Sequence, residues 1–408
     1  MIPDTVLMFA YHFPPENAIG GVRPFRFYKY LSRNGLKCHV ITVAPGADTI
    51  VSSAESMPDP FESGPRGSVG WQFERALRRL VLPGVAGTRW AWAASSAGQA
   101  FLVANPSACA VIYSTYPPFG PHLAAWRLAR LTKLPWVADF RDPMGDNPGD
   151  ALMTPTSRRV ATWLESQCVR HAQVVIANTD GAAERLRRLY PSWQGKIHLI
   201  WNGFDPEARV RPLPLSDGNR KIISHVGELY EGRDATPLLE SIGRLIDSGR
   251  LSPEAIRVRL VGPVRDGSVP GPEFLEKAAR LGWLELIAAQ VPQSEAQGIS
   301  ASSGATLLIQ PLSTLQVPGK LFEYVQIGRP VLAYVPPDSP SERILQRSGI
   351  PYRCVYAGSA PSVMDQRITE FFEMPWKDSV PAPWFEEQFN VERQTAALRR
   401  LLESAAAG

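Results

Sequence analysis

The sequence has no uninterrupted apolar run of the ~18 to 20 residues that a transmembrane helix requires. Its N-terminus lacks a basic stretch followed by an apolar one, so we see no secretory signal and expect a cytoplasmic protein. Only four cysteines are present, far apart and without a CxxC pair, which argues against a disulfide framework and against structural zinc. We expect these residues, Cys38, Cys109, Cys168 and Cys354, to be small buried hydrophobes.

Several signatures of chemistry are also missing. No DxD triplet, HExxH motif, His/Cys cluster or GxSxG elbow occurs, so neither a bound metal nor a serine nucleophile has support. The chain also has no GxGxxG fingerprint, Walker lysine motif, or RNA- or DNA-binding motif. We therefore expect no cofactor, no metal and no nucleic-acid partner.

What is present is core material for an enzyme of ordinary size. The chain has 408 residues, of which 44% are hydrophobic and 20% charged, and this length exceeds what one hydrophobic core usually fills. Up to position 213 there are 23 Lys and Arg against 16 Asp and Glu; beyond it there are 20 against 23. The first half, at +7, could meet nucleic acid, anionic lipid or a phosphorylated substrate, and its charge does not choose among them.

Short apolar runs alternate with helical patterns along both halves, which predicts an α/β fold with doubly wound parallel sheets. The expected strands are 5–10, 38–43, 109–113, 136–140, 173–177, 196–200, 221–226, 256–261, 285–288, 305–309 and 330–334. The Pro-rich segment from Trp201 to Pro214 is typical of an interdomain linker. We predict one domain over 1–205, a second over 206–385, and a C-terminal helix over 386–408 that returns to the first domain.

The stretch from 305 to 335 organises the second half. It predicts a strand, a loop, a helix from Pro318 and a further strand, with Lys320, Glu323 and Tyr324 on one charged helix face. A helix that follows a parallel strand directs its N-terminus to the ligand-binding edge of the sheet. An ammonium there suits a phosphate, and a carboxylate one turn later suits ribose hydroxyls. The alternative is a surface Lys–Glu pair at i,i+3 spacing.

Two loops of the first half are further candidates. Gly20-Gly21 precedes a helix expected over 22–32, where backbone can approach a ligand, although two adjacent glycines are also ordinary turn chemistry. Arg23, Arg26, Lys29 and Arg33 recur along that helix and are expected on its solvated face.

The second loop is Asp139-Phe140-Arg141-Asp142 at the end of a strand. Its charged groups could act on a substrate, or they could pin the loop as an Arg–Asp pair. His12 and His122 are expected in loops that face the cleft, and the other four histidines are expected to be structural.

Two more local patterns carry expectations. Aromatics and arginines mix between Trp71 and Trp92, which fits either a helix packed on its own domain or a segment on anionic lipid. In the second half Arg233 precedes a helix with Thr236 as N-cap, and Ser339 to Glu342 fits a capping box.

Several of these segments together match a known pattern. They are Gly20-Gly21, Trp136 to Pro143, Ile176 to Thr179, Ile200 to Asp205, Val226-Gly227 through Arg233, and Pro318 to Val331. On them, nearly the whole chain resembles the retaining glycosyltransferases of family 4, and Gly319 to Tyr324 resembles a variant subgroup that reads GKLFEY. The resemblance implies the GT-B fold of two facing Rossmann-like domains and a nucleoside diphosphate sugar as donor.

The resemblance also implies roles for individual residues. Arg233 and Lys320 would neutralise the donor diphosphate, and Glu323 would hold the ribose. The other implied donor and acceptor contacts are Gly20, Gly21, Gly227, Pro318 and Gly319, and His122 is a further candidate because of its expected place in a loop that faces the cleft. Arg141 and Asp142 fall where many members carry a histidine near the donor sugar, and both are candidate catalytic residues.

Two positions depart from the family pattern. Leu315 stands where the first acid of the family's glutamate pair usually contacts the donor hexose, and Glu228 replaces a frequent arginine. These departures leave the donor sugar open.

We therefore expect a metal-independent, retaining glycosyltransferase that works in polysaccharide or glycoconjugate biosynthesis, cytoplasmic and peripheral at the inner face of the membrane. The alternatives are a nucleotide-sugar epimerase on the same fold and a non-catalytic, transferase-like partner subunit.

Overall fold

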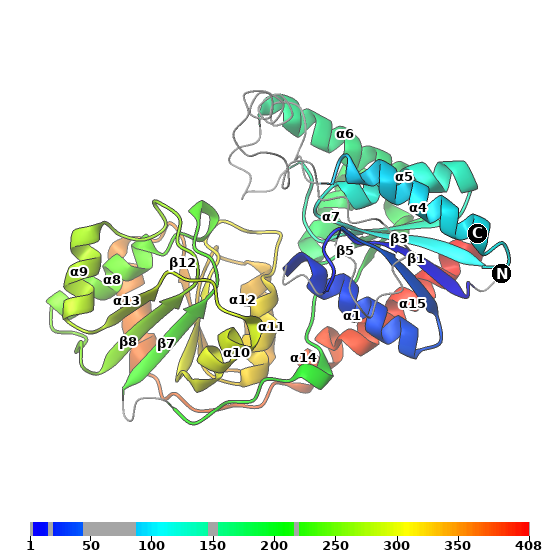
Figure 1. The fold of residues 1–408 in the computed structure, drawn as a ribbon. Helices are drawn as coiled ribbons and strands as arrows, with labels where there is room; N and C mark the ends of the chain where they lie inside the picture. Colours follow the sequence, from blue (N-terminus) through cyan, green and yellow to red (C-terminus); the bar gives the residue numbers. More distant parts are fainter. Residues whose placement is uncertain (1–2, 15–18, 44–86, 146–153, 216–219, 408) are drawn as a thin grey trace. The chain divides into compact units, whose positions relative to one another are not determined.

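A computed structural model describes residues 3–14, 19–43, 87–145, 154–215 and 220–407, which form two compact units (Figure 1). The first unit comprises Met1–Asn202 and Val391–Gly408, and the second comprises Gly203–Asn390. The first unit therefore ends at Asn202, three residues before the boundary predicted at 205. The C-terminal helix begins at Val391, whereas the predicted segment began at 386.

The first unit is built on a six-stranded parallel sheet of order β2-β1-β3-β4-β5-β6. Its strands are β1 (Thr5–Phe9), β2 (Lys37–Ile41), β3 (Ala110–Tyr116), β4 (Trp136–Phe140), β5 (Val174–Ala177) and β6 (Ile197–Leu199). The direction of winding reverses between β1 and β3, and ligands bind at such switch points in open parallel sheets.

Helices cover both faces of this sheet (Figure 1). They are α1 (Ile19–Arg33), α4 (Trp90–Ala104), α5 (Gly120–Thr132), α6 (Pro155–His171), α7 (Asp180–Leu189) and α15 (Val391–Ala407). Alternate residues of β1 enter two separate cores, as strand geometry requires: Leu7 and Phe9 pack on the side of α4 to α7, and Val6 and Met8 on the side of α1 and α15.

The second unit repeats the plan with the order β12-β11-β10-β7-β8-β9. Its strands are β7 (Lys221–Val226), β8 (Ile256–Val261), β9 (Leu284–Ile287), β10 (Ala305–Ile309), β11 (Val331–Val335) and β12 (Tyr352–Tyr356). Its helices are α8 (Thr236–Asp247), α9 (Pro272–Arg280), α10 (Gln293–Ser302), α11 (Gly319–Ile327), α12 (Pro340–Ser348), α13 (Pro361–Glu373) and α14 (Pro383–Phe389). Here the switch point lies between β7 and β10, and β12 is a strand that the sequence did not predict.

Local signals for the helix ends are largely accurate. Ser339 caps α12, its Oγ accepting a hydrogen bond from the Glu342 amide at 3.2 Å, as the capping box predicted. In α8 the N-cap is Ala235, one residue earlier than expected, and the Asp234 carboxylate accepts from the Thr236 amide at 2.8 Å.

Two global expectations can be compared with the described residues. Within these ranges we find no helix with the length and apolar character needed to cross a bilayer. All four cysteines are free; Cys168 and Cys354 are buried, whereas Cys38 and Cys109 are only half-buried. Most of the Trp71–Trp92 segment lies outside the described residues, and its last part begins α4.

Candidate functional site

The clearest polar constellation of the second unit lies at its switch point, where β7 and β10 end and α11 begins. Lys320 is in the first turn of α11, and its Nζ donates a hydrogen bond to the Val226 carbonyl oxygen at 2.9 Å. The same Nζ lies 3.2 Å from Nε2 of His225. Pro318, the N-cap, has no side-chain oxygen to satisfy the first amides of the helix. The Lys320 amine and an uncapped helix N-terminus therefore share one edge of the sheet.

His225 holds this amine from inside the sheet. Its ring is fully buried, and Nδ1 lies 3.0 Å from the Leu307 carbonyl oxygen. The pairing between β7 and β10 extends only to Ser224 and Thr306. The carbonyl oxygen of the next residue of β10, Leu307, therefore hydrogen-bonds to the imidazole and not to the backbone of β7. A ring that donates from Nδ1 leaves Nε2 as an acceptor for Lys320. Burial, reinforced by the Lys320 charge, lowers the pKa of His225 well below its usual value, which keeps the ring neutral.

Gly227 makes room for the Lys320 amine. Its φ is +143°, and a Cβ built on it would lie 2.5 Å from Nζ of Lys320. Gly262 also has a positive φ, +137°, and its Cβ would meet the Gly227 carbonyl oxygen at 2.5 Å. The two glycines thus let the turns after β7 and β8 pack closely while the amine lies against the first of them.

The charges around Lys320 oppose its protonation. Burial lowers the pKa of Lys320 well below its usual value, the nearby Arg233 charge lowers it further, and Glu323 partly offsets both. Lys320 and Glu323 are each half-buried, and the amine hydrogen-bonds to β7. The arrangement differs from a solvated i,i+3 ion pair. Tyr324 is only 2% exposed, but it lies on the same helix face, close to the Val226 backbone and to the charges of Glu323 and Arg233, and burial raises the pKa of its hydroxyl.

Arg233 ends a short 3-10 turn over Glu231–Arg233, directly ahead of α8. Its guanidinium lies 5.2 Å from the centre of the Tyr230 ring, a cation–π contact that orients the side chain. Its charge is felt at both Lys320 and His225. Two cationic side chains from different elements therefore converge on the same edge of the sheet.

The two departures from the family pattern lie near this edge. Glu228 follows Gly227 directly, and its Oε1 pairs with Nε of Arg265 at 2.7 Å, so an exposed ion pair stands in place of a single positive charge. Leu315 is half-buried in the loop between β10 and α11. Gly319, the first residue of α11, has open space around its Cα, so its lack of a side chain leaves that edge uncovered.

In the first unit Arg141 ties three segments together. Its guanidinium donates to the carbonyl oxygens of Gly20 at 2.5 Å, of Tyr116 at 3.1 Å, and of Pro117. Burial lowers the pKa of Arg141, and the charge of Asp142 offsets part of this effect. Arg141 is thus engaged mainly with backbone, which favours a role in positioning the loops after β3 and at the start of α1.

The glycine pair lies inside α1 rather than before it. The helix begins at Ile19, and a Cβ on Gly20 would approach the His12 ring to 2.9 Å. A Cβ on Gly21 would approach Phe13 Cα to 3.2 Å. The expected helix start at Val22 is therefore wrong, because these glycines let the first turn of α1 pack on the segment that leaves β1.

Arg23 and Asp139 form a buried ion pair. The sequence patterns had instead suggested a solvated Arg23 and an Asp139 in the loop beside Arg141. Arg23 is 7% exposed, and its Nε lies 2.8 Å from Oδ2 of Asp139, so the expectation that Arg23 lies on the solvated face is wrong. Tyr113 donates to the same carboxylate at 2.5 Å. Burial alone would lower the pKa of Arg23, but the Asp139 carboxylate outweighs it and raises the pKa. The network fixes α1 to β3 and β4 and leaves Asp139 no freedom to pair with Arg141.

His122 is buried in the first turn of α5, not in a loop as expected. Its Nδ1 lies 2.8 Å from Ser114 Oγ, which accepts a hydrogen bond from Trp136 Nε1. Burial lowers the pKa of His122 to about 3, so the ring is neutral at physiological pH. Contact between this residue and a substrate stays a prediction.

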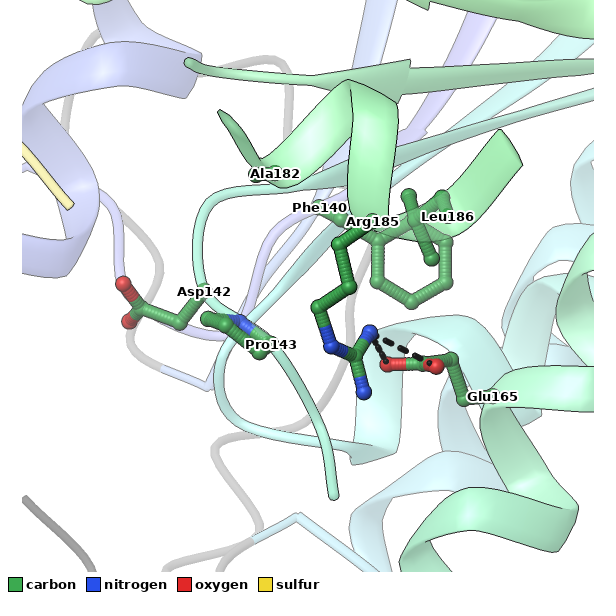
Figure 2. Close-up of a pocket in the computed structure, with 7 residues that line it drawn as sticks. All are labelled: Phe140, Asp142, Pro143, Glu165, Ala182, Arg185 and Leu186. Carbon is green, nitrogen blue, oxygen red and sulfur yellow. Dashed lines mark hydrogen bonds and ion pairs between the residues drawn. The ribbon is translucent and has the colours of Figure 1, made fainter. Parts of the chain in front are cut away.

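Asp142 borders a small pocket that also contains the buried Glu165–Arg185 pair (Figure 2). Figure 2 shows the Asp142 carboxylate turned away from that pair. Glu165 accepts from Arg185, from Tyr190 at 3.0 Å and from the Met144 amide at 3.1 Å, which makes it a structural hub. The pocket volume of about 10 Å³ suits at most one water molecule, so it is too small for a nucleotide. Among the described residues no group of three His, Cys, Asp or Glu side chains could hold a metal ion.

Comparison with known proteins gives these features a context. Residues 20–203 match the model of the family described as "Glycosyl transferase 4-like domain". The D-inositol 3-phosphate glycosyltransferase of Gordonia bronchialis is 27% identical over 177 residues, 41% of this chain and 39% of that protein. The enzyme of the same name from Streptomyces avermitilis is 30% identical over 206 residues, 46% of this chain and 41% of that protein. The chain thus spans about two fifths of the length of these relatives.

Solved structures share the fold along nearly the whole chain. Anabaena HepE in complex with UDP is 15% identical with a TM-score of 0.57, covering 98% of this chain and 100% of that one. An α,α-trehalose-phosphate synthase (UDP-forming) from Burkholderia vietnamiensis is 12% identical with a TM-score of 0.61, covering 99% of each chain. The two six-stranded units therefore have the GT-B architecture of two Rossmann-like domains.

Proposed function

We propose that this protein is a glycosyltransferase that moves a hexose-type sugar from a nucleoside diphosphate sugar to an acceptor. The observation that carries the proposal is the Lys320 amine, held against the turn after β7 at the uncapped N-terminus of α11. The match of residues 20–203 to a glycosyltransferase family supports it. The acceptor classes in view are a glycan, a lipid-linked saccharide or a small natural product.

Electrostatic stabilisation of the leaving group is the main chemical task. As the glycosidic bond breaks, negative charge develops on the departing diphosphate, and Lys320, Arg233 and the α11 N-terminus would offset it. A dianionic ligand would also favour the protonated form of Lys320, whose pKa is low in the unliganded protein. Glu323, one turn along α11, would accept hydrogen bonds from the ribose hydroxyls.

The remaining assignments complete the proposal. Solved structures of the same fold were determined with UDP and UDP-glucose, which makes a uridine donor the first to test. Transfer with retention and without a metal is proposed, with Asp142 as the group nearest to the acceptor or sugar and Arg141 as the residue that positions its loop. We further propose a cytoplasmic location with peripheral association to an anionic membrane.

The test is an assay of sugar transfer in two steps. A thermal-shift screen over UDP-, GDP- and ADP-sugars would first identify the donor, because a ligand of the native state raises the melting temperature. Release of the nucleoside diphosphate is then followed with and without candidate acceptors, in EDTA. Acceptor-dependent release in EDTA is expected. Conversion of the donor alone to an epimer, or activity that needs added magnesium or manganese, would contradict the proposal.

A further inference from the structure

Three adjacent helices of the first unit form a face with an unusual distribution of charge. Figure 1 shows α4, α5 and α6 together on one side of the sheet. Together they contain five arginines and a single acidic residue, Glu165, which is fully buried against Arg185. No acidic side chain of these three helices therefore reaches solvent, and their exposed charges are positive.

Large apolar side chains lie exposed among these arginines. Trp92 of α4 is 55% exposed, Leu131 of α5 is 55% exposed, and Trp163 of α6 is 54% exposed. Each would be an unremarkable exception alone, but three on neighbouring helices of one face form a patch.

Ring contacts show that the patch is continuous from α4 to α6. The Arg127 guanidinium lies 5.3 Å from the centre of the Trp92 ring, and Arg130 lies 5.9 Å from that of Trp126. The Trp126 ring is 6.3 Å from Trp163 and stacks on His171 at 5.5 Å. The charges of Arg130 and Arg170 both lower the pKa of His171, in addition to burial, which indicates how closely the positive groups gather.

We infer that this face, defined by Trp92, Arg127, Arg130, Leu131, Arg159, Trp163 and Arg170, docks on the surface of an anionic phospholipid bilayer. Exposed tryptophans suit the headgroup layer because their rings are apolar and their N–H groups are polar. Exposed arginines suit a negative surface potential, and no exposed acid on these helices opposes it. A nucleic acid would neutralise the charges but would leave the aliphatic Leu131 in water, and docking on an acidic protein alone would give no recovery of the wild type on either neutral or anionic vesicles.

The inference deepens the membrane association within the proposed function, and it moves the docking surface from the Trp71–Trp92 segment to the helices α4, α5 and α6. It does not depend on the donor site, which lies in the second unit. Flotation of the protein with vesicles and sugar transfer in solution can therefore fail independently of each other.

The experiment is flotation of the full chain with two kinds of vesicle. One contains phosphatidylcholine alone, and the other also contains about 30% of the anionic lipid phosphatidylglycerol. The double variant Arg130→Glu/Arg159→Glu is expected to lower partitioning onto the anionic vesicles by at least about tenfold. Trp163→Ser should lower it by about tenfold as well, because an interfacial ring is lost. All variants should keep their circular dichroism spectra, since these side chains are exposed.

Matched controls come from the second unit. Arg280→Glu changes the charge at an exposed arginine of α9, and Val380→Ser removes an apolar side chain that is 86% exposed. Both should leave flotation within about twofold of wild type. Equal recovery of the wild type on neutral and anionic vesicles, no recovery on either, or an equal loss in the control variants would overturn the inference.

Discussion

The environment of the Lys320 amine differs from that of a solvated surface lysine. The amine donates a hydrogen bond to the Val226 carbonyl oxygen and lies against the neutral, buried imidazole of His225. An exposed ion pair would contribute ~0 to 1 kcal/mol, and its loss would have little effect on function. An amine with a lowered pKa beside a helix N-terminus is instead suited to bind an anion, because the anion would favour the protonated form of the amine.

Glu323 and Lys320 should therefore differ in their kinetic roles. Glu323→Gln replaces one acceptor oxygen with a donor amide and weakens charge-assisted bonds worth ~1.5 to 3 kcal/mol, so it should chiefly raise the donor KM. Lys320→Ala removes a charge that contributes more as the leaving group departs, so it should chiefly lower kcat. Steady-state kinetics on folded variants measures both. Changes of no more than a few-fold in both variants would contradict the roles assigned to Lys320 and Glu323.

A second consequence of this environment is that Lys320 should take up a proton when an anionic ligand binds. Because burial and Arg233 lower the pKa of Lys320, an anionic ligand that raises it again should bind together with a proton. The groups facing the amine are His225, Arg233 and Glu323; Glu323 opposes the shift, and the neutral His225 carries no charge to it. Affinity for a nucleoside diphosphate should thus rise as the pH falls through the range below the usual lysine pKa of about 10.4.

Calorimetry in two buffers of different ionisation enthalpy measures this proton uptake directly. The wild type should show buffer-dependent binding enthalpies, and Lys320→Ala should lose most of that dependence. Identical enthalpies for the wild type in both buffers would contradict the assigned environment of Lys320.

At the scale of elements, the turn after β7 decides where that amine can lie. Gly227→Ala places a Cβ where Nζ of Lys320 now lies and also imposes a strained φ, whereas Gly249→Ala at φ +71° meets open space. Gly249→Ala should lose about 1 to 2 kcal/mol of folding stability from its left-handed φ, and Gly227→Ala, whose φ of +143° lies outside that region, about 1 to 3 kcal/mol. Only Gly227→Ala should also lose donor affinity, because the lysine end must move. Denaturant unfolding and ligand titration of both variants test this; equal donor affinity in the two would contradict the account.

The elements were the part that the sequence predicted best. Apolar runs such as Ala305–Ile309 and Val331–Val335 are buried strands, because a parallel sheet covered on both faces needs continuous apolar strands. β12 was missed because Tyr352–Tyr356 is an edge strand whose arginine and tyrosines remain partly exposed. The start of α1 was misplaced because Gly20 and Gly21, which usually break helices, are needed there for close packing.

The candidate site was predicted less completely, for a different reason. Helical spacing and chain position were enough to single out Lys320 and Glu323. Nothing local could show that His225 would turn towards Lys320, because that contact joins residues far apart in sequence. Periodicity likewise placed Arg23 on a solvated face, whereas its partner Asp139 lies more than a hundred residues away. A buried charge with a distant partner leaves no periodic signal.

At the scale of the whole molecule, the C-terminal helix α15 packs in the core of the first unit, although it follows the second unit in the sequence. Leu398 and Leu402 of α15 are fully buried in the same core as Val6 and Met8 of β1. Leu398→Ala should therefore cost about 2 to 5 kcal/mol of stability in the first unit alone. Hydrogen exchange should accelerate in β1, β3 and β4 and stay unchanged in β7 to β12. The exposed control Arg400→Ala should change neither unit. Faster exchange in both units would show that they unfold together.

The central claim is that the second unit binds a nucleoside diphosphate sugar at the edge where Lys320 and Glu323 lie. Isothermal titration of UDP, GDP and ADP into the full chain, in EDTA, tests it most directly. We predict saturable binding of at least one of the three to the wild type, and affinity at least about tenfold weaker in Glu323→Gln, the loss expected from a weakened charge-assisted hydrogen bond. Gly249→Ala should bind as the wild type does. No binding of any of the three nucleotides, or equal affinity in Glu323→Gln and wild type, would contradict the assignment.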